Sequence, residues 1–303
     1  MLEPPDAMAM AAVPARRMLI MIRFRALAGL SLSVLASACI AAEATSRIEI
    51  PITQTRLSDG NIRYSVPVRV EGGGTIPAML DTGSVGLRIM ARALAAAQYE
   101  ETGVTRQYRF GTGIVLSGPL VRAVVAVGAA STAGPITMQI VQSVGCAQGR
   151  PDCPAARLDP SDYGIGGDGL PREGFDAILG LSMYKAPISP VAANPLGAIG
   201  DRKWIVELPL PDASGPGRLI VNPGRAERAG FRAIAPGAAG SKDGQAGAGN
   251  RLSLCLDGKA PKDRCAPVKL DTGDRDGLQP FYAYAILFDQ HRGAVAVKSR
   301  RAE

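Results

Sequence analysis

The tripeptide Asp-Thr-Gly occurs twice in this chain, at residues 81–83 and 271–273. Each copy directly follows an apolar residue at the end of a strand-like run, so each places a carboxylate where burial is expected. An ionised carboxylate is costly to bury unless a partner uses or shares its charge. We therefore predict that two halves of the chain, with motifs far apart in the sequence, each bring one carboxylate to a shared site.

Two adjacent carboxylates have a well-defined chemistry. When they are held a few ångströms apart they cannot both ionise cheaply, so they share one proton at moderate pH and titrate as a pair. The ionised member can act as a general base on water while the protonated member polarises a substrate carbonyl. Gly83 and Gly273 allow the turns to approach closely, and Thr82 and Thr272 can hydrogen-bond across the pair. The alternative is two ordinary turns on unrelated loops.

The composition favours a β-rich protein with many turns. The 303 residues include 36 glycines and 23 prolines, whereas aromatic residues are few and long charged helix-forming stretches are absent. A chain of this length can bury a substantial core in one large or two medium domains. The formal charge is +7, but its lysines and arginines are scattered, which disfavours nucleic-acid binding and favours a soluble basic protein.

The segment 1–44 resembles an export signal. Two arginines precede an apolar run at 26–36, which is too short to span a bilayer as a stable helix. Small residues at 36–38 and at 42–44 fit signal cleavage sites. The residues leading into Cys39 also resemble a bacterial lipoprotein motif, which would attach the protein to a membrane through a lipid on that cysteine. We expect an exported protein that is periplasmic, secreted or lipid-anchored in the bacterial envelope.

The remaining cysteines form two close pairs, Cys146 with Cys153 and Cys255 with Cys265. Each pair encloses a short polar loop, and local disulfides are the natural interpretation for an exported chain. A zinc site is disfavoured because the only histidine is His291 and the pairs lack Cys-x-x-Cys spacing.

Alternating apolar and polar residues between Gly- and Asp-rich turns predict several strands and hairpins. One helix is expected at 90–99, where alanine and leucine dominate. The Gly-Thr-Gly at 111–113 is expected at the mobile tip of a long hairpin, as a lid over a cleft or as an ordinary edge hairpin. A flexible surface loop is expected at 236–250. The predicted strands and hairpins are a hairpin at 48–70, a strand ending at Asp81, a hairpin at 107–127, strands at 175–181 and 217–222, and a hairpin at 284–297.

These motifs together resemble the pepsin-like aspartic peptidases. Residues 80–85 resemble the first catalytic loop of that family, and residues 265–273 resemble the segment that leads into the second. The family's flap sequence, Tyr-Gly-Thr-Gly, matches residues 110–113 except at the first position. Further similar segments are 175–181, 217–232 and the strands from Phe288 onward. The resemblance runs in order from about Ile48 to Val297, and this ordered set is more specific than any single motif.

The resemblance implies a mostly β, bilobed pepsin-like acid-protease fold with a reduced C-terminal lobe. The lobes would span 45–205 and 206–303, with Asp81 and Asp271 as the catalytic dyad between them. It further implies hydrolysis of peptide bonds in a peptide or protein substrate by a monomer, without a covalent intermediate, metal, cofactor or nucleic acid. The implied supporting residues are Thr82, Gly83, Ser84, Thr272 and Gly273, and the implied flap residues are Phe110, Gly111, Thr112 and Gly113.

Three departures from the family pattern leave a second hypothesis open. Phe110 lacks the hydroxyl of the flap tyrosine, and Asp274 replaces a serine or threonine, so its charge would raise the proton affinity of the dyad or disturb its geometry. The interval between Asp271 and Phe288 is short, which reduces the second lobe. The alternative is a non-catalytic pepsin-like binding or scaffold protein of the cell envelope. A calcium loop at 271–277 is disfavoured because it lacks alternating ligands and a final glutamate.

Overall fold

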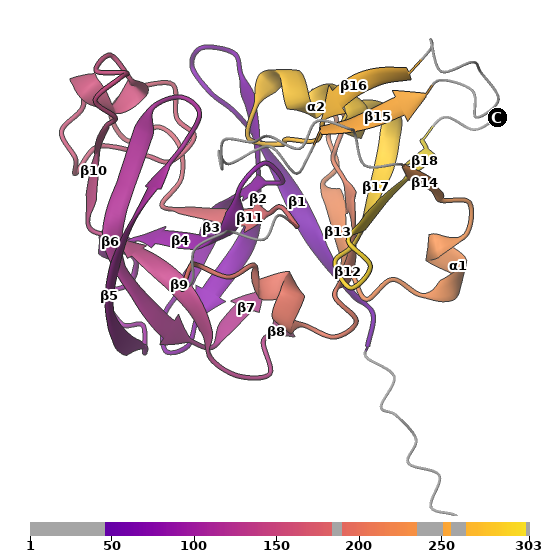
Figure 1. Cartoon of the computed structure of the whole chain (residues 1–303), viewed down its shortest axis with the longest axis horizontal. Coiled ribbons are helices and arrows are strands. Elements are labelled where there is room, and N and C mark those ends of the chain that lie inside the picture. Colours follow the sequence, from indigo (N-terminus) through magenta and orange to yellow (C-terminus); the bar gives the residue numbers. More distant parts are fainter. Residues whose placement is uncertain (1–45, 184–189, 235–250, 256–264, 301–303) are drawn as a thin grey trace, which may run out of the picture. The chain divides into compact units, whose positions relative to one another are not determined.

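The computed structural model describes residues 46–183, 190–234, 251–255 and 265–300, with side chains described except at 251–255 and 265–268 (Figure 1). These residues all belong to one compact unit, Ala44–Glu303. The predicted export segment with Cys39, the predicted loop at 236–250, and the side chains of Cys255 and Cys265 lie outside the described residues and side chains.

The structure is mostly β, as predicted, and is built on one large mixed sheet. The strands are β1 (Ile48–Arg56), β2 (Ile62–Val70), β3 (Thr75–Asp81), β4 (Val85–Met90), β5 (Glu100–Arg109), β6 (Ile114–Ala123), β7 (Val125–Val127), β8 (Ala130–Ser131), β9 (Ile136–Val141), β10 (Ser143–Cys146), β11 (Ala177–Leu181), β12 (Lys203–Glu207), β13 (Gly217–Val221), β14 (Arg232–Ile234), β15 (Arg251–Cys255), β16 (Cys265–Lys269), β17 (Tyr284–Asp289) and β18 (Ala294–Ser299). The helices are α1 (Arg225–Arg228) and α2 (Arg275–Ala283), with 3₁₀ turns at Ala91–Ala93, Pro154–Arg157 and Pro195–Ala198.

The main path of the sheet runs β10-β6-β9-β4-β11-β3-β2-β1-β13-β12-β17-β18-β14, and β15 pairs with β16 in a separate hairpin. The predicted hairpins at 48–70, 107–127 and 284–297 are confirmed by the antiparallel pairs β1–β2, β5–β6 and β17–β18. No helix in the described parts of the chain has the length and apolar character needed to cross a membrane.

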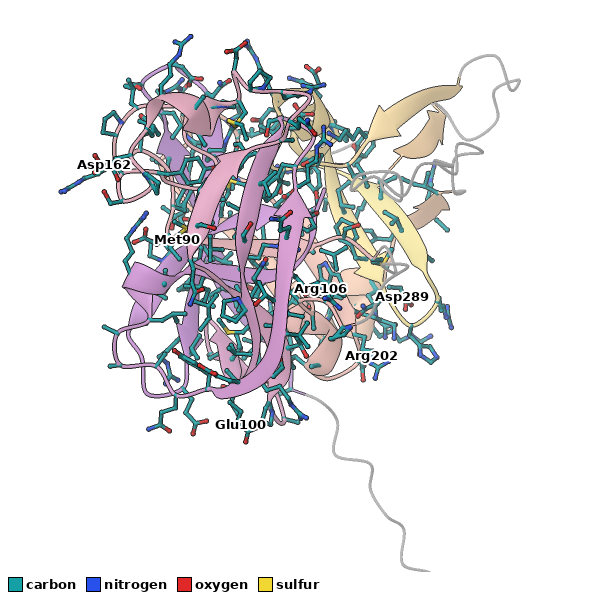
Figure 2. The ribbon with its side chains drawn as sticks, turned by 60° about the vertical axis from the view of Figure 1, so that its left-hand side comes forward. Met90, Glu100, Arg106, Asp162, Arg202 and Asp289 are labelled. Atoms are coloured by element: carbon teal, nitrogen blue, oxygen red, sulfur yellow. A yellow bond between two sulfur atoms is a disulfide. The ribbon has the colours of Figure 1, made fainter. Side chains whose placement is uncertain are left out.

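The predicted helix at 90–99 is wrong. Strand β4 continues to Met90, and only a single 3₁₀ turn follows before β5 begins at Glu100 (Figure 2). The backbone N–H of Gln98 donates to the carbonyl of Glu71 at 2.7 Å. This hydrogen bond ties the segment to the turn after β2, and such tertiary contacts override local propensity even where alanine favours a helix.

Strand β11 inserts between the two strands that flank the first Asp-Thr-Gly turn. It pairs in parallel with β3, where Gly180 lies opposite Asp81, and antiparallel with β4, where Gly180 lies opposite Gly86. A methyl group built on Gly180 would lie 2.7 Å from the backbone of Val85. The glycine therefore lets the backbone of β11 lie close to that of the first Asp-Thr-Gly turn.

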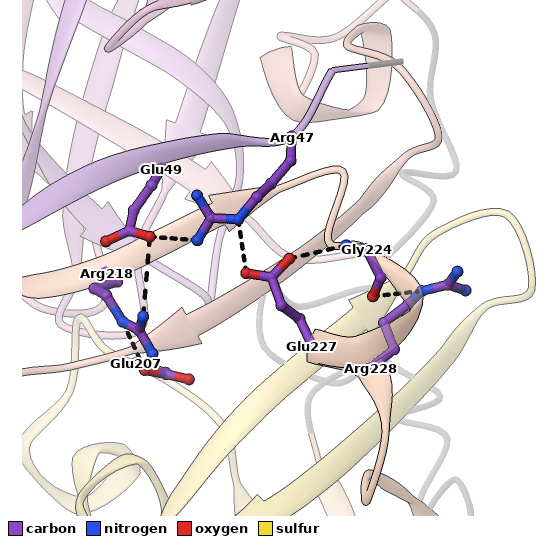
Figure 3. A network of polar contacts seen from close by, with 7 residues as sticks. All are labelled: Arg47, Glu49, Glu207, Arg218, Gly224, Glu227 and Arg228. Carbon is purple, nitrogen blue, oxygen red and sulfur yellow. Dashed lines mark hydrogen bonds and ion pairs between the residues drawn. The ribbon is translucent and has the colours of Figure 1, made fainter. Parts of the chain in front are cut away.

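Strand β1 links two groups of strands in the sheet. Its residues 48–52 pair with β13, and its residues 53–56 pair with β2. Ion pairs on the surface reinforce this junction (Figure 3). Arg47 contacts Glu49 and donates from Nε to Glu227 of α1 at 2.7 Å, while Arg218 on β13 pairs with Glu207 at 2.5 Å. Such exposed pairs each contribute at most about 1 kcal/mol, so backbone pairing and the core hold β1 in place.

Candidate active site

The two Asp-Thr-Gly turns meet in the structure. Asp81 ends β3 and Asp271 lies just after β16, with 4% and 8% of their surfaces exposed. The two carboxyl groups lie within hydrogen-bonding reach of each other. A methyl group built on Gly83 would lie 2.2 Å from Asp271 Oδ2, and one built on Gly273 would lie 2.9 Å from Asp81 Oδ1. Each turn needs glycine because a carboxylate occupies the space that a side chain would fill.

Reciprocal hydrogen bonds between the two threonines hold the turns together. The hydroxyl of Thr82 accepts from the backbone N–H of Thr272 at 3.1 Å and donates to the Leu270 carbonyl at 3.1 Å. The hydroxyl of Thr272 accepts from the N–H of Thr82 at 3.1 Å and donates to the Leu80 carbonyl at 2.5 Å. Both threonines are fully buried, so each hydroxyl satisfies two backbone groups that water cannot reach.

Replacing Thr272 with valine is expected to lower the free energy of unfolding by about 2–3 kcal/mol, because the Thr82 N–H and the Leu80 carbonyl both lose a buried partner. Thr272→Ser keeps the hydroxyl and serves as the matched control, with a loss expected to be clearly smaller. Urea unfolding of both variants measures the difference. Equal stabilities would contradict the contribution assigned to the hydroxyl.

The dyad carboxylates also accept backbone hydrogen bonds. The N–H of Gly83 donates to Asp81 Oδ1 at 2.7 Å, and the N–H of Gly273 donates to Asp271 Oδ1 at 2.9 Å. Burial is the largest cause that raises the pKa of Asp81 to about 7, and the charge of Asp271 acts in the same direction, against the nearby Ser84 hydroxyl and the hydrogen bond from the Gly83 N–H. The pair therefore retains a proton near neutral pH.

The symmetry of the two turns ends at the residue after the glycine. Ser84 lies beside Asp81, although its buried hydroxyl makes no hydrogen bond with the described residues, whereas Asp274, at the matching place in the second turn, caps helix α2. The Oδ1 atom of Asp274 accepts from the backbone N–H of Asp276 at 3.3 Å. Among the described residues, Asp271 Oδ2 has a charged partner that Asp81 lacks.

That partner is Lys269, which the sequence analysis did not identify. Its Nζ lies 2.7 Å from Asp271 Oδ2 and 2.7 Å from Asp274 Oδ2, so the ammonium bridges the two carboxylates. Alternation could have revealed it, because residues two apart in an extended segment point to the same face. Among the described side chains, no group of three or more His, Cys, Asp or Glu is placed to hold a metal ion.

Helix α2 follows the second turn and was not predicted. Gly277 and Pro280 both disfavour a helix in the interior of such a segment. Asp274 caps the helix, and burial of Leu278 and Phe281 supplies the stabilisation that propensity lacks. A methyl group built on Gly277 would lie 2.5 Å from Asp271 Cβ, so this glycine lets the helix approach the second carboxylate.

A buried arginine lies beside the first turn. Arg88 on β4 is 3% exposed, and its guanidinium lies 3.4 Å from the ring centroid of Tyr108 on β5. Its Nη1 donates to the Val85 carbonyl at 2.7 Å. Burial lowers the pKa of Arg88 to about 10, so the group stays charged at neutral pH. The Tyr108 hydroxyl lies near Ser84 and the backbone of Val85, where it forms no hydrogen bond with the described residues, and so places beside the first turn a hydroxyl that Phe110 lacks.

Residues 110–113 form the turn between β5 and β6. The ring of Phe110 meets that of Tyr108 edge-on, with centroids 4.9 Å apart, and the Gly113 carbonyl accepts from the N–H of Ala147 at 2.8 Å. Ala147 lies in the loop closed by the predicted disulfide between Cys146 and Cys153, which is confirmed. The hairpin tip therefore rests on a covalently closed loop.

The backbone register pairs Cys255 with Cys265 across β15 and β16, but their side chains are outside the described ones, so the second predicted disulfide stays a prediction.

Comparison with known proteins assigns this chain to no family. No protein-family model matches the chain, and no curated protein matches its sequence. Functional inference therefore depends on the geometry of the two turns and their surroundings.

Proposed function

We propose that this protein is a pepsin-like aspartic endopeptidase in which Asp81 and Asp271 form the catalytic dyad. The observation that supports it most is the reciprocal bonding of Thr82 and Thr272, which joins the two Asp-Thr-Gly turns and sets their carboxyl groups against each other. Two unrelated Asp-Thr-Gly turns would have no reason to exchange buried hydrogen bonds across the structure.

The reaction would need only these two carboxyl groups and water. The ionised carboxylate takes a proton from water, and the water oxygen forms a bond to the carbonyl carbon of the peptide. The protonated carboxyl donates its proton to the carbonyl oxygen, which yields a tetrahedral diol. The carboxyl that received the water proton then gives it to the amide nitrogen, and the other carboxylate takes a proton back from a diol hydroxyl. The C–N bond breaks, an amine and a carboxylic acid are released, and the dyad regains its starting protonation. The raised pKa of Asp81 supports its assignment as the proton donor.

The proposal extends to the surroundings of the dyad. The β5–β6 hairpin, which brings Tyr108 beside the first turn, would cover a bound peptide with its 110–113 tip. The lobes of the proposed fold would be 45–205 and 206–303. A monomer exported to the bacterial envelope, free or held by a lipid on Cys39, is the proposed setting. The Cys146–Cys153 disulfide is compatible with export.

The test is cleavage of an unbiased peptide mixture by purified protein from about pH 3 to about pH 8, a range that brackets the dyad's titration. Asp81→Asn and Asp271→Asn, tested separately, are each expected to lose about 10²–10⁴-fold in rate, because each removes one acid–base group. Asp276→Asn, an exposed carboxylate in the first turn of α2, is the matched control and should keep full activity.

Absence of cleavage at every pH by well-folded wild type, together with failure to bind a statine-type transition-state analogue, would contradict the peptidase. That result would favour the non-catalytic binding protein instead. Activity that survives both dyad substitutions would show that another site is responsible.

A further inference from the structure

The two carboxyl groups of the dyad have unequal electrostatic partners. Asp271 Oδ2 is 2.7 Å from the ammonium of Lys269, whose side chain is 33% exposed. Within the described part of the chain, Asp81 forms no ion pair with a lysine or arginine. Its Oδ1 accepts instead from the backbone N–H of Gly83 at 2.7 Å, which is a neutral donor. A cation in direct contact favours the ionised form of the carboxylate it touches.

We propose that Lys269 is a positioning residue that assigns the two roles in the dyad. By contacting Asp271 it keeps that carboxylate ionised as the base that takes a proton from water, and it leaves the shared proton on Asp81 as the acid. This inference rests on the proposed function for its catalytic consequence, although the proton assignment itself is a property of the folded protein.

Lys269 keeps its charge in this position. Burial acts to lower its pKa, but hydrogen bonds to Asp271 and Asp274 outweigh that effect and raise the pKa above its ordinary value. Asp274 would otherwise repel Asp271, and the same ammonium holds it ionised: burial opposes this, but Lys269 lowers the pKa of Asp274 overall. The expected like-charge conflict at position 274 is thus met by a cation between the two carboxylates.

Charged and titratable groups from other elements also act on this site. Arg63 on β2 attracts Asp274, and Arg88 on β4 attracts Asp81 but donates to the Val85 carbonyl. Tyr108 on β5 interacts electrostatically with Arg88 and Asp81. Of these cations only Lys269 forms an ion pair with a dyad carboxylate, so its removal should change the proton distribution more than any other single substitution.

Two substitutions should move the dyad's titration in opposite directions. Lys269→Met removes the cation and is expected to move the dyad's titration to higher pH, because the ionised carboxylate of Asp271 loses its partner. Asp274→Asn removes the second carboxylate that shares the Lys269 ammonium and is expected to move the dyad's titration to lower pH. Lys269→Arg keeps the charge and should restore wild-type behaviour in large part. Carbon-13 NMR of labelled aspartate carboxyl groups measures these titrations in the intact protein, with near-UV circular dichroism to check the fold.

In wild type, the titration near neutral pH is expected at Asp81, with Asp271 ionised throughout that range. If catalysis occurs, the acid limb of the kcat/KM profile should move up in pH for Lys269→Met and down for Asp274→Asn. A wild-type proton on Asp271, or titrations that neither substitution moves, would overturn the inference. An inactive protein that still shows the asymmetric titration would refute only the peptidase, because the NMR measurement needs no turnover. Asp274→Asn retains Lys269, so it tests the inference even if Lys269→Met does not fold.

Discussion

Replacing Gly83 with alanine is expected to reduce peptidase activity by at least about 100-fold and to destabilise the fold by about 1–3 kcal/mol. The added methyl group would lie 2.2 Å from Asp271 Oδ2 and 2.2 Å from Asp271 Cγ, a separation that real side chains do not adopt. Asp271 cannot move aside without loss of its contacts with Lys269 and the Gly273 N–H. The two carboxyl groups are therefore forced apart and can no longer share a proton.

Gly134→Ala is the matched control for this substitution. A methyl group at Gly134 would meet no atom within 4 Å, so neither activity nor stability should change appreciably. Peptide cleavage and urea unfolding measure the two effects separately. A Gly83→Ala protein with wild-type activity would contradict the close contact between the first turn and Asp271.

Protonation of Asp81 is expected to make the protein more stable in mild acid than at neutral pH. The pKa of Asp81 is raised to about 7, mainly by burial, whereas an unfolded aspartate titrates near about 3.9. The folded state therefore binds the proton more tightly, and this contribution is fully present below about pH 4 and is lost as the pH rises through about 7. The lost contribution is on the order of 4 kcal/mol.

Urea unfolding at intervals between about pH 4 and about pH 7 tests this linkage. Asp81→Asn resembles the protonated carboxyl and cannot titrate, so the variant should lack the corresponding decline in stability with rising pH. The difference between the two proteins isolates Asp81 from other titrating groups. Parallel stability curves would show that Asp81 titrates alike in the folded and unfolded states.

Much of the strand structure follows from local sequence. The hairpin around the Asp-Gly-Asn turn at 59–61 forms as predicted, and Gly60 adopts a φ of +81° that the turn requires. The Cys146–Cys153 disulfide was also predictable, because a short polar loop separates the two residues. Local signals failed where distant contacts prevailed: the segment at 91–99 forms only a 3₁₀ turn and irregular chain bonded to Glu71, and α2 forms despite Gly277 and Pro280.

Of the candidate site, the sequence indicated the groups at its centre but not their environment. The paired motifs identified Asp81 and Asp271 as candidates, and the structure brings their carboxyl groups together. Lys269 was missed although it lies two residues before Asp271 in an extended segment, whereas Arg88 and Tyr108 were missed because a single charged or aromatic residue in a strand carries no sign of its partner.

By itself, the sequence determined that the chain is mostly β, where several of its hairpins form, and that two carboxylates follow apolar runs. Those properties depend on neighbouring residues, which the sequence displays directly. Only the tertiary structure decided that Thr82 and Thr272 exchange hydrogen bonds and that an ammonium bridges Asp271 and Asp274. The first depends on long-range pairing between turns, and the second on the direction of side chains at the end of β16. Alternation places Lys269 and Asp271 on one face, but only packing brings Asp274 to the same ammonium and one turn against the other.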